Sequence, residues 1–333
     1  MTREHAGGAG TATAAFDPAD WPRDLLTAGA LPCLSLEALL DLAAEMKANP
    51  TGWRDGLAGE TIACFFDPPT TGMTVSVGAA ADGLGMQVVE LPRAELLVGG
   101  GEPLADIVRT FSATAAALFV HGVGQTALRD VAAAASVPVF NGLSDEHRPC
   151  QAVADLLTLR ERFGRLEGLV VAFVGDGADP IAHSLLEAGA LSSMEIRVAC
   201  PPQLRPSGVV LIGAEALAEL HGGRVVVGDD PEAAVDGADA VYTAPWVPPG
   251  REAERAARVE LLRRYCVHPG LMALAKHRAV LLHCLPARRG EEVSEHVIDG
   301  VRSLAWEQVR NRVPAMRAAL YVLVRAARDQ RER

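Results

Sequence analysis

The stretch LVVAFVGDGADPIAHSLLEA, residues 169–188, decides the fold class. Residues 169–174 form an unbroken apolar run, which is typical of a β-strand buried on both faces. A glycine-rich turn follows at 175–177, and residues 181–188 then have the spacing of a helix. A buried strand that leads into a helix is the repeating unit of a parallel sheet covered by helices. The segment therefore predicts an α/β protein.

The same alternation recurs on both sides of this segment. We predict strands over residues 61–66, 116–120, 137–140, 196–199, 224–227, 240–243 and 280–283, and helices over 35–47, 126–135, 151–163, 214–220, 231–235 and 313–328. Ser35 is the expected N-cap of the first of these helices. Two doubly wound parallel sheets fit a chain of 333 residues, with helix 151–163 as the link between them.

Composition excludes several classes of protein. The chain carries 31 Lys and Arg residues against 42 Asp and Glu residues, a formal net charge of −11, and it has no basic block. This balance argues against nucleic acid or a membrane surface as the main partner. Residues 1–16 lack the apolar core of a secretory signal, so we interpret them as a disordered tail. The six cysteines lie far apart without a CxxC pair, which favours reduced thiols and a cytoplasmic location.

Ligands of open α/β sheets bind beyond the carboxyl ends of the strands. This rule selects the loops that follow Phe66, Val120, Phe140, Val174 and Leu282 as candidate site segments.

Three of these loops carry polar groups. The glycine-rich turn at 175–180 could hold a phosphate on its backbone N–H groups. However, Pro180 occupies the position of the third glycine in the dinucleotide-binding fingerprint. The turn is therefore either a substrate-facing loop or a plain tight turn that ends the strand. Residues 141–151 open a helix whose first turn favours an anion, with Arg148 and Gln151 as donors. His283 and Cys284 are adjacent and point to opposite sides of a strand, so they are poor partners for one metal.

Together these segments resemble the aspartate/ornithine transcarbamylase family, and its ornithine carbamoyltransferase branch most closely. The resemblance runs from about residue 31 to about residue 320. It rests on SLEALLDLAAEMK (35–47), HGVGQTALRDVAAAASVPVFNGLSDEHRPCQAVADLLTL (121–159), VAFVGDG (171–177), DAVYT (239–243), Trp246, HCLPARRGEEVSEHVIDG (283–300) and Asn311-Arg312.

The resemblance implies an architecture and a reaction. A carbamoyl-phosphate domain would comprise residues 17–150 and 313–333, because the last helix returns to it. An amino-acid domain would comprise 165–305, with 151–164 as the linking helix. The reaction would be attack of an uncharged amine on the carbamoyl carbon of a phosphorylated donor, without metal or cofactor. Family members are homotrimers, and the loop that each gives to its neighbour falls near residues 99–103.

The donor motifs depart from the family pattern. The family's Ser-Thr-Arg-Thr phosphate loop aligns with residues 70–73, where Gly72 replaces the arginine. His121 occupies the position of a second family arginine. Arg148 occupies the position of the histidine in the family's His-Pro-x-Gln motif. Two lost arginines remove roughly 3–6 kcal/mol of donor binding, which Arg148 and a protonated His121 restore in part. The predicted catalytic residues are His121, Arg148 and Cys284, and the predicted donor-binding residues are Thr70, Thr71, Gly72, Met73, Gln151, Leu285 and Arg312.

The acceptor motifs depart as well. The positions that hold the ends of ornithine in the family fall at Asp179, Pro180, Ala244, Pro248 and Pro249, so most of the expected polar groups are missing. We therefore expect an amino-acid-like acceptor other than ornithine, with Asp179 facing a cationic group.

Two hypotheses remain open from the sequence. The first is a divergent carbamoyltransferase, in which His121 lies near the leaving phosphate and the carbonyls of Cys284 and Leu285 orient the substrates. The second is a ligand-binding or partner protein on the same scaffold without transferase activity, since a fold does not fix a reaction.

Overall fold

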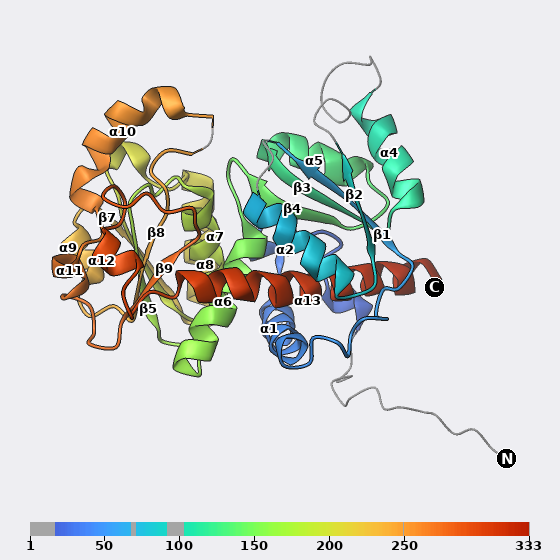
Figure 1. The fold of residues 1–333 in the computed structure, drawn as a ribbon, viewed down its shortest axis with the longest axis horizontal. Coiled ribbons are helices and arrows are strands. Elements are labelled where there is room, and N and C mark those ends of the chain that lie inside the picture. Colours follow the sequence, from blue (N-terminus) through green and yellow to red (C-terminus); the bar gives the residue numbers. More distant parts are fainter. Residues whose placement is uncertain (1–16, 68–70, 92–102, 249, 333) are drawn as a thin grey trace.

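The computed structural model describes residues 17–67, 71–91, 103–248 and 250–332 (Figure 1). Two parallel sheets confirm the predicted fold class. The first has the strand order β2-β1-β3-β4 and the second β7-β6-β5-β8-β9. The strands are β1 Thr61–Phe66, β2 Gln87–Leu91, β3 Ala117–Val123, β4 Val139–Ser144, β5 Val170–Val174, β6 Glu195–Ala199, β7 Arg224–Gly228, β8 Ala240–Thr243 and β9 Val280–His283.

Helices cover the sheets of both domains (Figure 1). The first domain contains α1 Cys33–Ala48, α2 Thr71–Asp82, α4 Leu104–Thr114, α5 Gln125–Ala134 and α6 Pro149–Phe163. The second contains α7 Pro180–Leu191, α8 Gly208–His221, α9 Pro231–Val235, α10 Arg255–Leu262, α11 Pro269–Met272 and α12 Glu295–Ile298. The last helix, α13 Ala305–Glu332, packs against α1, α2 and α6, as the resemblance implied.

Several helix starts differ from the sequence prediction, and α8 begins at Gly208 rather than at residue 214. The last helix begins at Ala305 rather than at residue 313, and it keeps Pro314 in its interior. The first helix begins at Cys33, and Ser35 does not cap it. Instead, Ser35 donates its hydroxyl to the carbonyl of Asp20 at 2.7 Å, a tertiary contact that local sequence does not reveal.

A buried hydrogen-bond cluster joins the two domains. Asp155 of α6 accepts hydrogen bonds through Oδ1 from Gln151 Nε2 at 2.7 Å and from Gln308 Nε2 of α13 at 2.8 Å. Its Oδ2 accepts from the Tyr242 hydroxyl of β8 at 2.8 Å. Because all four side chains are buried, these bonds fix the linking helix against both α13 and the second sheet.

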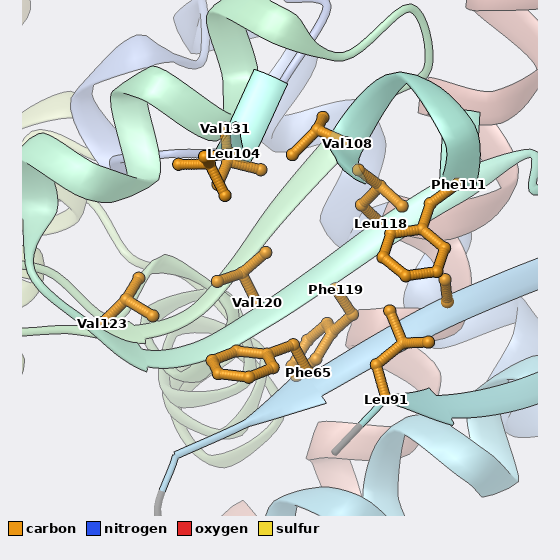
Figure 2. A pocket seen from close by; sticks show the side chains of 11 residues that line it. Phe65, Leu91, Leu104, Val108, Phe111, Leu118, Phe119, Val120, Val123 and Val131 are labelled. Atoms are coloured by element: carbon orange, nitrogen blue, oxygen red, sulfur yellow. The ribbon is translucent and has the colours of Figure 1, made fainter. Parts of the chain in front are cut away.

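An apolar cavity lies inside the first domain, between its sheet and α4 (Figure 2). Its walls include Phe65, Val108, Phe111 and Val131, and its volume is about 20 Å³. A space of that size without polar lining is a small packing void rather than a place for an anionic ligand.

No helix within the described ranges has both the length and the apolar character that a membrane crossing requires. All six cysteines carry free thiols, in agreement with the sequence prediction.

Candidate functional site

Arg312 brings four parts of the chain together where the two domains meet. From α13, its Nε donates to Gln151 Oε1 of α6 at 2.6 Å, and its Nη2 donates to the carbonyl of Cys284, just after β9. A Cβ on Gly72, at the start of α2, would lie 3.5 Å from Arg312 Nη1. The four residues Gly72, Gln151, Cys284 and Arg312 therefore lie side by side, although they are far apart in the sequence.

Arg148 is the second cation at this junction. It is the N-cap residue of α6, and its backbone N–H donates to Ser184 Oγ of α7 at 2.7 Å. Its charge is within electrostatic range of His121, Asp179 and Arg312. Its buried Nε has no hydrogen-bond partner among residues 17–67, 71–91, 103–248 and 250–332.

The two guanidinium groups thus form an unneutralised pair. Neither Arg148 nor Arg312 makes an ion pair with a carboxylate in the described part of the chain. Burial and the neighbouring charge of Arg148 lower the pKa of Arg312 from its usual value. Asp179 lies within electrostatic range of Arg148, and Asp155 within range of Arg312, but neither carboxylate is close enough for an ion pair. Two neighbouring arginines, one with an unused donor, are therefore candidates to bind an anion such as a phosphate.

His121 does not add a third positive charge. It lies at the end of β3, is 4% exposed, and packs its ring against Phe66 at a centroid distance of 5.9 Å. Burial, and secondly Arg148, lower the pKa of His121 to about 3, so the imidazole is neutral at pH 7. The expected protonated His121 is therefore wrong, because a buried ring next to an arginine does not hold a second proton. Its Nδ1 has no partner among the described residues.

The close approach of β3 to β1 depends on one glycine. Gly122 has a φ of +91°, and a Cβ there would overlap the carbonyl oxygen of Asp67. The Asp67 N–H donates to the His121 carbonyl at 2.8 Å, which holds the loop after β1 against the end of β3. Only glycine allows this close contact between the end of β3 and Asp67.

Cys284 contributes its backbone rather than its thiol. The side chain is 2% exposed, and burial raises the thiol pKa to about 12, so no thiolate is available at pH 7. Its carbonyl is held by Arg312. The next residue, Leu285, has a φ of +50°, and its N–H donates to His283 Nδ1 at 2.9 Å. This local bond sets the direction of the loop after β9.

The start of α2 presents one hydroxyl and one residue without a side chain. Thr71 and Gly72 are exposed at the helix start, and the Gly72 carbonyl accepts from Ser76 Oγ at 2.8 Å. Met73 is 1% exposed and its side chain packs in the core, so donor binding by this residue, which stays a prediction, would have to use its backbone N–H. Thr70, Pro249 and the neighbour loop at 99–102 lie outside the described residues.

The acceptor side has few unpaired polar groups. Asp179 is the N-cap of α7, its Oδ1 accepting from the Ile181 N–H at 2.8 Å, and Pro180 is the first residue of that helix. Ala244 is buried after β8 and Pro248 is partly exposed. None of Pro180, Ala244 and Pro248 has a side-chain hydrogen-bond donor or acceptor.

A buried ion pair lies behind Asp179. Arg258 of α10 pairs with Asp176, and its Nε donates to the carbonyl of Trp246. This cation is therefore already neutralised. The Trp246 Nε1 is buried and has no partner within the ranges that the structure describes; a Cβ on Gly175 would lie 3.5 Å from it. The unpaired indole N–H thus lies next to the turn that leads to Asp179.

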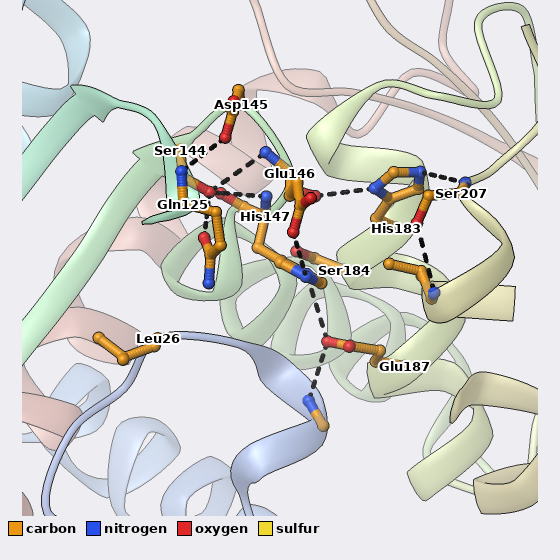
Figure 3. Close-up of polar contacts among 12 residues, drawn as sticks. Leu26, Gln125, Ser144, Asp145, Glu146, His147, His183, Ser184, Glu187 and Ser207 are labelled. Atoms are coloured by element: carbon orange, nitrogen blue, oxygen red, sulfur yellow. Dashed lines mark hydrogen bonds and ion pairs between the residues drawn. The ribbon is translucent and has the colours of Figure 1, made fainter. Parts of the chain in front are cut away.

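The loop that carries Arg148 is fastened to the second domain (Figure 3). The Glu146 carbonyl accepts from His183 Nδ1 of α7 at 2.9 Å, and His183 Nε2 accepts from the Ser207 N–H at 3.2 Å. Because Nε2 accepts, the proton of the neutral ring is on Nδ1. Together with Ser184, His183 sets the position of Arg148 from the opposite domain.

A histidine–glutamate contact extends this attachment (Figure 3). His147 Nδ1 lies 3.5 Å from Glu187 Oε2, which also accepts from the Gly29 N–H at 3.0 Å. Burial raises the pKa of Glu187 to about 7 and lowers that of His147 to about 4. At pH 7 His147 is neutral and Glu187 is about half ionised.

Sequence reasoning missed the residues that support the site. Asp155, Tyr242 and Gln308 belong to the buried cluster, and Ser184 and Glu187 fasten the loop. One signal was present for the first, since Gln151 and Asp155 are four apart on a helix whose other positions in that stretch are nearly all apolar.

The fold is that of a two-domain α/β protein, with Arg148 and Arg312 where its two domains meet. Residues 23–161 match the family model described as aspartate/ornithine carbamoyltransferase, carbamoyl-P binding domain, and residues 167–323 match the model of its Asp/Orn binding domain. The chain belongs to the aspartate/ornithine carbamoyltransferase family, a family of transferases, which confirms the resemblance in the sequence.

Individual relatives cover nearly the whole chain. An ornithine carbamoyltransferase of Thermosynechococcus vestitus is 41% identical over 304 residues, 91% of this chain and 96% of that protein. The ornithine carbamoyltransferase structure from Pyrococcus furiosus has a TM-score of 0.86 at 37% identity, covering 90% of this chain and 96% of that one. An N-acetyl-L-ornithine transcarbamylase structure has a TM-score of 0.81 at 25% identity, covering 90% and 99%.

Proposed function

We propose that this protein transfers a carbamoyl or similar group from a phosphorylated donor to an amine of an amino-acid-like molecule other than ornithine. The observation that carries the proposal is the presence of Arg148 and Arg312 at the domain junction, neither in an ion pair among the described residues and Arg148 with an unused buried donor. A phosphate dianion is the ligand that would neutralise both groups and use that donor.

The donor would be held by fewer arginines than the family motif provides. Arg148 and Arg312 would take the phosphate, with Gln151 and the Thr71 hydroxyl as further candidates. Gly72 has no side chain and His121 is neutral, so neither replaces the arginine expected at its position. We therefore expect weaker donor binding than a site with all the motif arginines would give.

Catalysis would rest on positioning and charge stabilisation. The amine nitrogen attacks the carbamoyl carbon, and the developing charge on the leaving phosphate is stabilised by the two arginines. The carbonyls of Cys284 and Leu285 would orient the donor amide or the acceptor amine. The protonated thiol of Cys284 takes no part as a nucleophile in this scheme.

The acceptor would differ from ornithine at the end away from the reacting amine. Ala244 and Pro248 offer no polar side chain there, and Arg258 is neutralised by Asp176. This supports a molecule with fewer charged groups at that end than a free amino acid has. The structural relative N-acetyl-L-ornithine transcarbamylase, by its name, acts on another acceptor.

A binding or partner protein without transfer is the second candidate. The neutral imidazole of His121 and the absence of a side chain at Gly72 favour this second candidate, because both weaken the binding of a donor phosphate.

A product assay separates these candidates. The protein is incubated with carbamoyl phosphate and a panel of amines that includes ornithine and N-acetylornithine, and phosphate and ureido products are measured. The proposal is supported if the kcat/KM for carbamoyl transfer to another amine of the panel is higher than the kcat/KM for transfer to ornithine. Binding of carbamoyl phosphate or another anion without turnover of any amine supports the second candidate and contradicts the first.

Assembly, location and domain limits complete the proposal. We propose a homotrimer in the cytoplasm, with domain limits of 17–150 plus 313–333 and 165–305 joined by 151–164. Family membership supports the trimer, and sedimentation equilibrium would test it: a monomer mass would contradict it.

A further inference from the structure

A buried histidine–glutamate pair lies behind the loop that follows β9. His283 and Glu292 are both 0% exposed, and His283 Nε2 lies 3.3 Å from Glu292 Oε1. The other ring nitrogen, Nδ1, accepts from the Leu285 N–H at 2.9 Å. Resting on the proposed function, we propose that Glu292 is a positioning residue, which acts through His283 to orient the Leu285 carbonyl toward an N–H of the donor's carbamoyl group.

The contacts of the imidazole ring determine where its proton lies. Because Nδ1 accepts a backbone N–H, it carries no proton, so the proton of the neutral ring is on Nε2 and is donated to Glu292 Oε1. The same carboxylate oxygen accepts from the Arg288 N–H. Glu292 therefore holds His283 in the one tautomer and orientation that can bind the Leu285 N–H.

The backbone at Leu285 needs this support. Leu285 has a φ of +50°, and within the described ranges it is one of two non-glycine residues with a positive φ. This conformation is unfavourable for a residue with a Cβ and persists only where surrounding contacts hold it. The Leu285 N–H is held by the ring of His283, whose own backbone N–H donates to Gln308 Oε1 at 2.7 Å. The direction of the peptide at Leu285 thus depends on the His283 ring.

The Leu285 carbonyl is free to accept a hydrogen bond from a ligand. It accepts none from residues 17–67, 71–91, 103–248 and 250–332, and Leu285 is partly exposed. The preceding carbonyl, that of Cys284, is already bound by Arg312, to which the proposed function assigns the phosphate. An N–H donor attached to that phosphate would therefore meet the Leu285 carbonyl. Carbamoyl phosphate has such an N–H group, whereas acetyl phosphate has none.

Packing alone does not account for the buried pair. Both side chains lose their hydration, and Glu292 Oε2 has no hydrogen-bond partner in the part of the chain that the structure describes. Apolar side chains of similar volume would fill the same space at a lower cost in free energy. A costly carboxylate that is kept behind a loop of the site indicates a contribution to function.

Calorimetric titration with carbamoyl phosphate, acetyl phosphate and inorganic phosphate tests this inference. The wild type should bind carbamoyl phosphate roughly 3- to 10-fold more tightly than acetyl phosphate, the effect of one neutral hydrogen bond. In Glu292→Leu, which removes the acceptor, this ratio should fall to about 1. Inorganic phosphate should bind within about twofold of the wild type, because Arg148 and Arg312 are unchanged. Glu292→Gln, whose amide oxygen still accepts from His283, should keep the ratio.

Glu291→Leu is the matched control, because Glu291 lies in the same turn but pairs with Arg255 instead of His283. It should leave the ratio at the wild-type value. If Glu292→Leu does not fold, Glu292→Asp withdraws the carboxylate by one methylene group and should lower the ratio in a folded protein.

The outcomes separate this inference from the proposed transfer. A wild type that binds the two acyl phosphates equally, or a folded Glu292→Leu or Glu292→Asp protein that keeps the wild-type ratio, would overturn the inference alone. An equal loss of affinity for inorganic phosphate in Glu292→Leu would show general damage to the site and would also contradict it. A wild type that binds neither acyl phosphate would overturn both proposals, and one that prefers carbamoyl phosphate but carbamoylates no amine would overturn only the transfer.

Discussion

Two buried polar clusters lie within the linking region, and they differ in how completely their groups are paired. Around Asp155, both oxygens of the carboxylate are hydrogen-bonded, accepting from Gln151, Gln308 and Tyr242. Around Arg148, the guanidinium Nε and the nearby Nδ1 of His121 are unpartnered in the described chain.

The contrast distinguishes the Asp155 cluster, which stabilises the fold, from the Arg148 cluster, which has unpaired groups available to a ligand. An unpaired buried donor costs free energy in the empty protein, and the cost is recovered only when something binds. The paired cluster joins α6, α13 and β8 within the chain itself, whereas the unpaired one is where we propose that an anion binds. Mutations in the first should therefore change stability, and mutations in the second should change binding.

Asp155→Ala should produce the largest effect. It leaves three buried donors without their acceptor, so the free energy of unfolding should fall by about 3–5 kcal/mol. Urea denaturation measures this change. Tyr242→Phe, which removes one of the three bonds, is the matched variant and should cost about 1 kcal/mol. Equal and small losses in both variants would show that the paired cluster does not hold the domains together.

Gly72→Arg should strengthen donor binding. A Cβ at Gly72 meets only Arg312 Nη1, at 3.5 Å, so the longer side chain can be accommodated. One more charge-assisted bond to phosphate is worth about 1.5–3 kcal/mol, which is roughly a 10- to 100-fold tighter dissociation constant for carbamoyl phosphate.

The control for this change is Val75→Arg, which adds the same charge on the same helix at a side chain that is 64% exposed. Calorimetric titration should find it near the wild-type affinity. If Gly72→Arg weakens donor binding, or reduces turnover with the native acceptor, the pocket has been rebuilt around another ligand.

Glu187→Gln should change the pH dependence of stability. The folded-state pKa of Glu187, about 7, lies above the ordinary glutamate value of 4.5, so the folded protein binds one more proton than the unfolded chain between these pH values. The free energy of unfolding therefore loses the contribution of this group as pH rises from 4.5 to 7. The glutamine variant does not lose it, so its stability relative to the wild type should increase by about 2–3 kcal/mol between pH 5 and pH 8.

Thermal or urea unfolding at the two pH values checks this prediction. The exposed Glu219→Gln on α8 serves as the control and should show no such trend. A relative stability of Glu187→Gln that stays constant with pH would mean that the His147–Glu187 contact does not titrate as described.

The sequence predicted buried strands more accurately than the exposed edge strand β2. The strand at 170–174 is apolar throughout and the one at 280–283 is apolar up to His283, and both were predicted within one residue. The edge strand β2 was missed because four of its five residues are exposed, so it has no buried apolar pattern. Motif resemblance located Arg148, Gln151 and Arg312, which meet only in the folded chain.

The parts that were missed depend on tertiary contacts. Tyr242 and Asp155 are 87 positions apart, and no local pattern pairs them. The charge of His121 was predicted wrongly because its pKa is set by burial and by Arg148, not by its neighbours in sequence. The burial of Met73 likewise follows from how α2 packs on the core.

Titration of carbamoyl phosphate by calorimetry into wild type, Arg148→Gln and Arg160→Gln examines the proposed anion site itself. Both variants remove one positive charge from α6, but Arg160 pairs with Asp41 at 2.7 Å near the other end of the helix. If Arg148 and Arg312 hold the phosphate, Arg148→Gln weakens binding at least about tenfold and Arg160→Gln leaves it unchanged. Equal affinities for the two variants would contradict this account, because the unpaired arginine would then have no part in holding the donor.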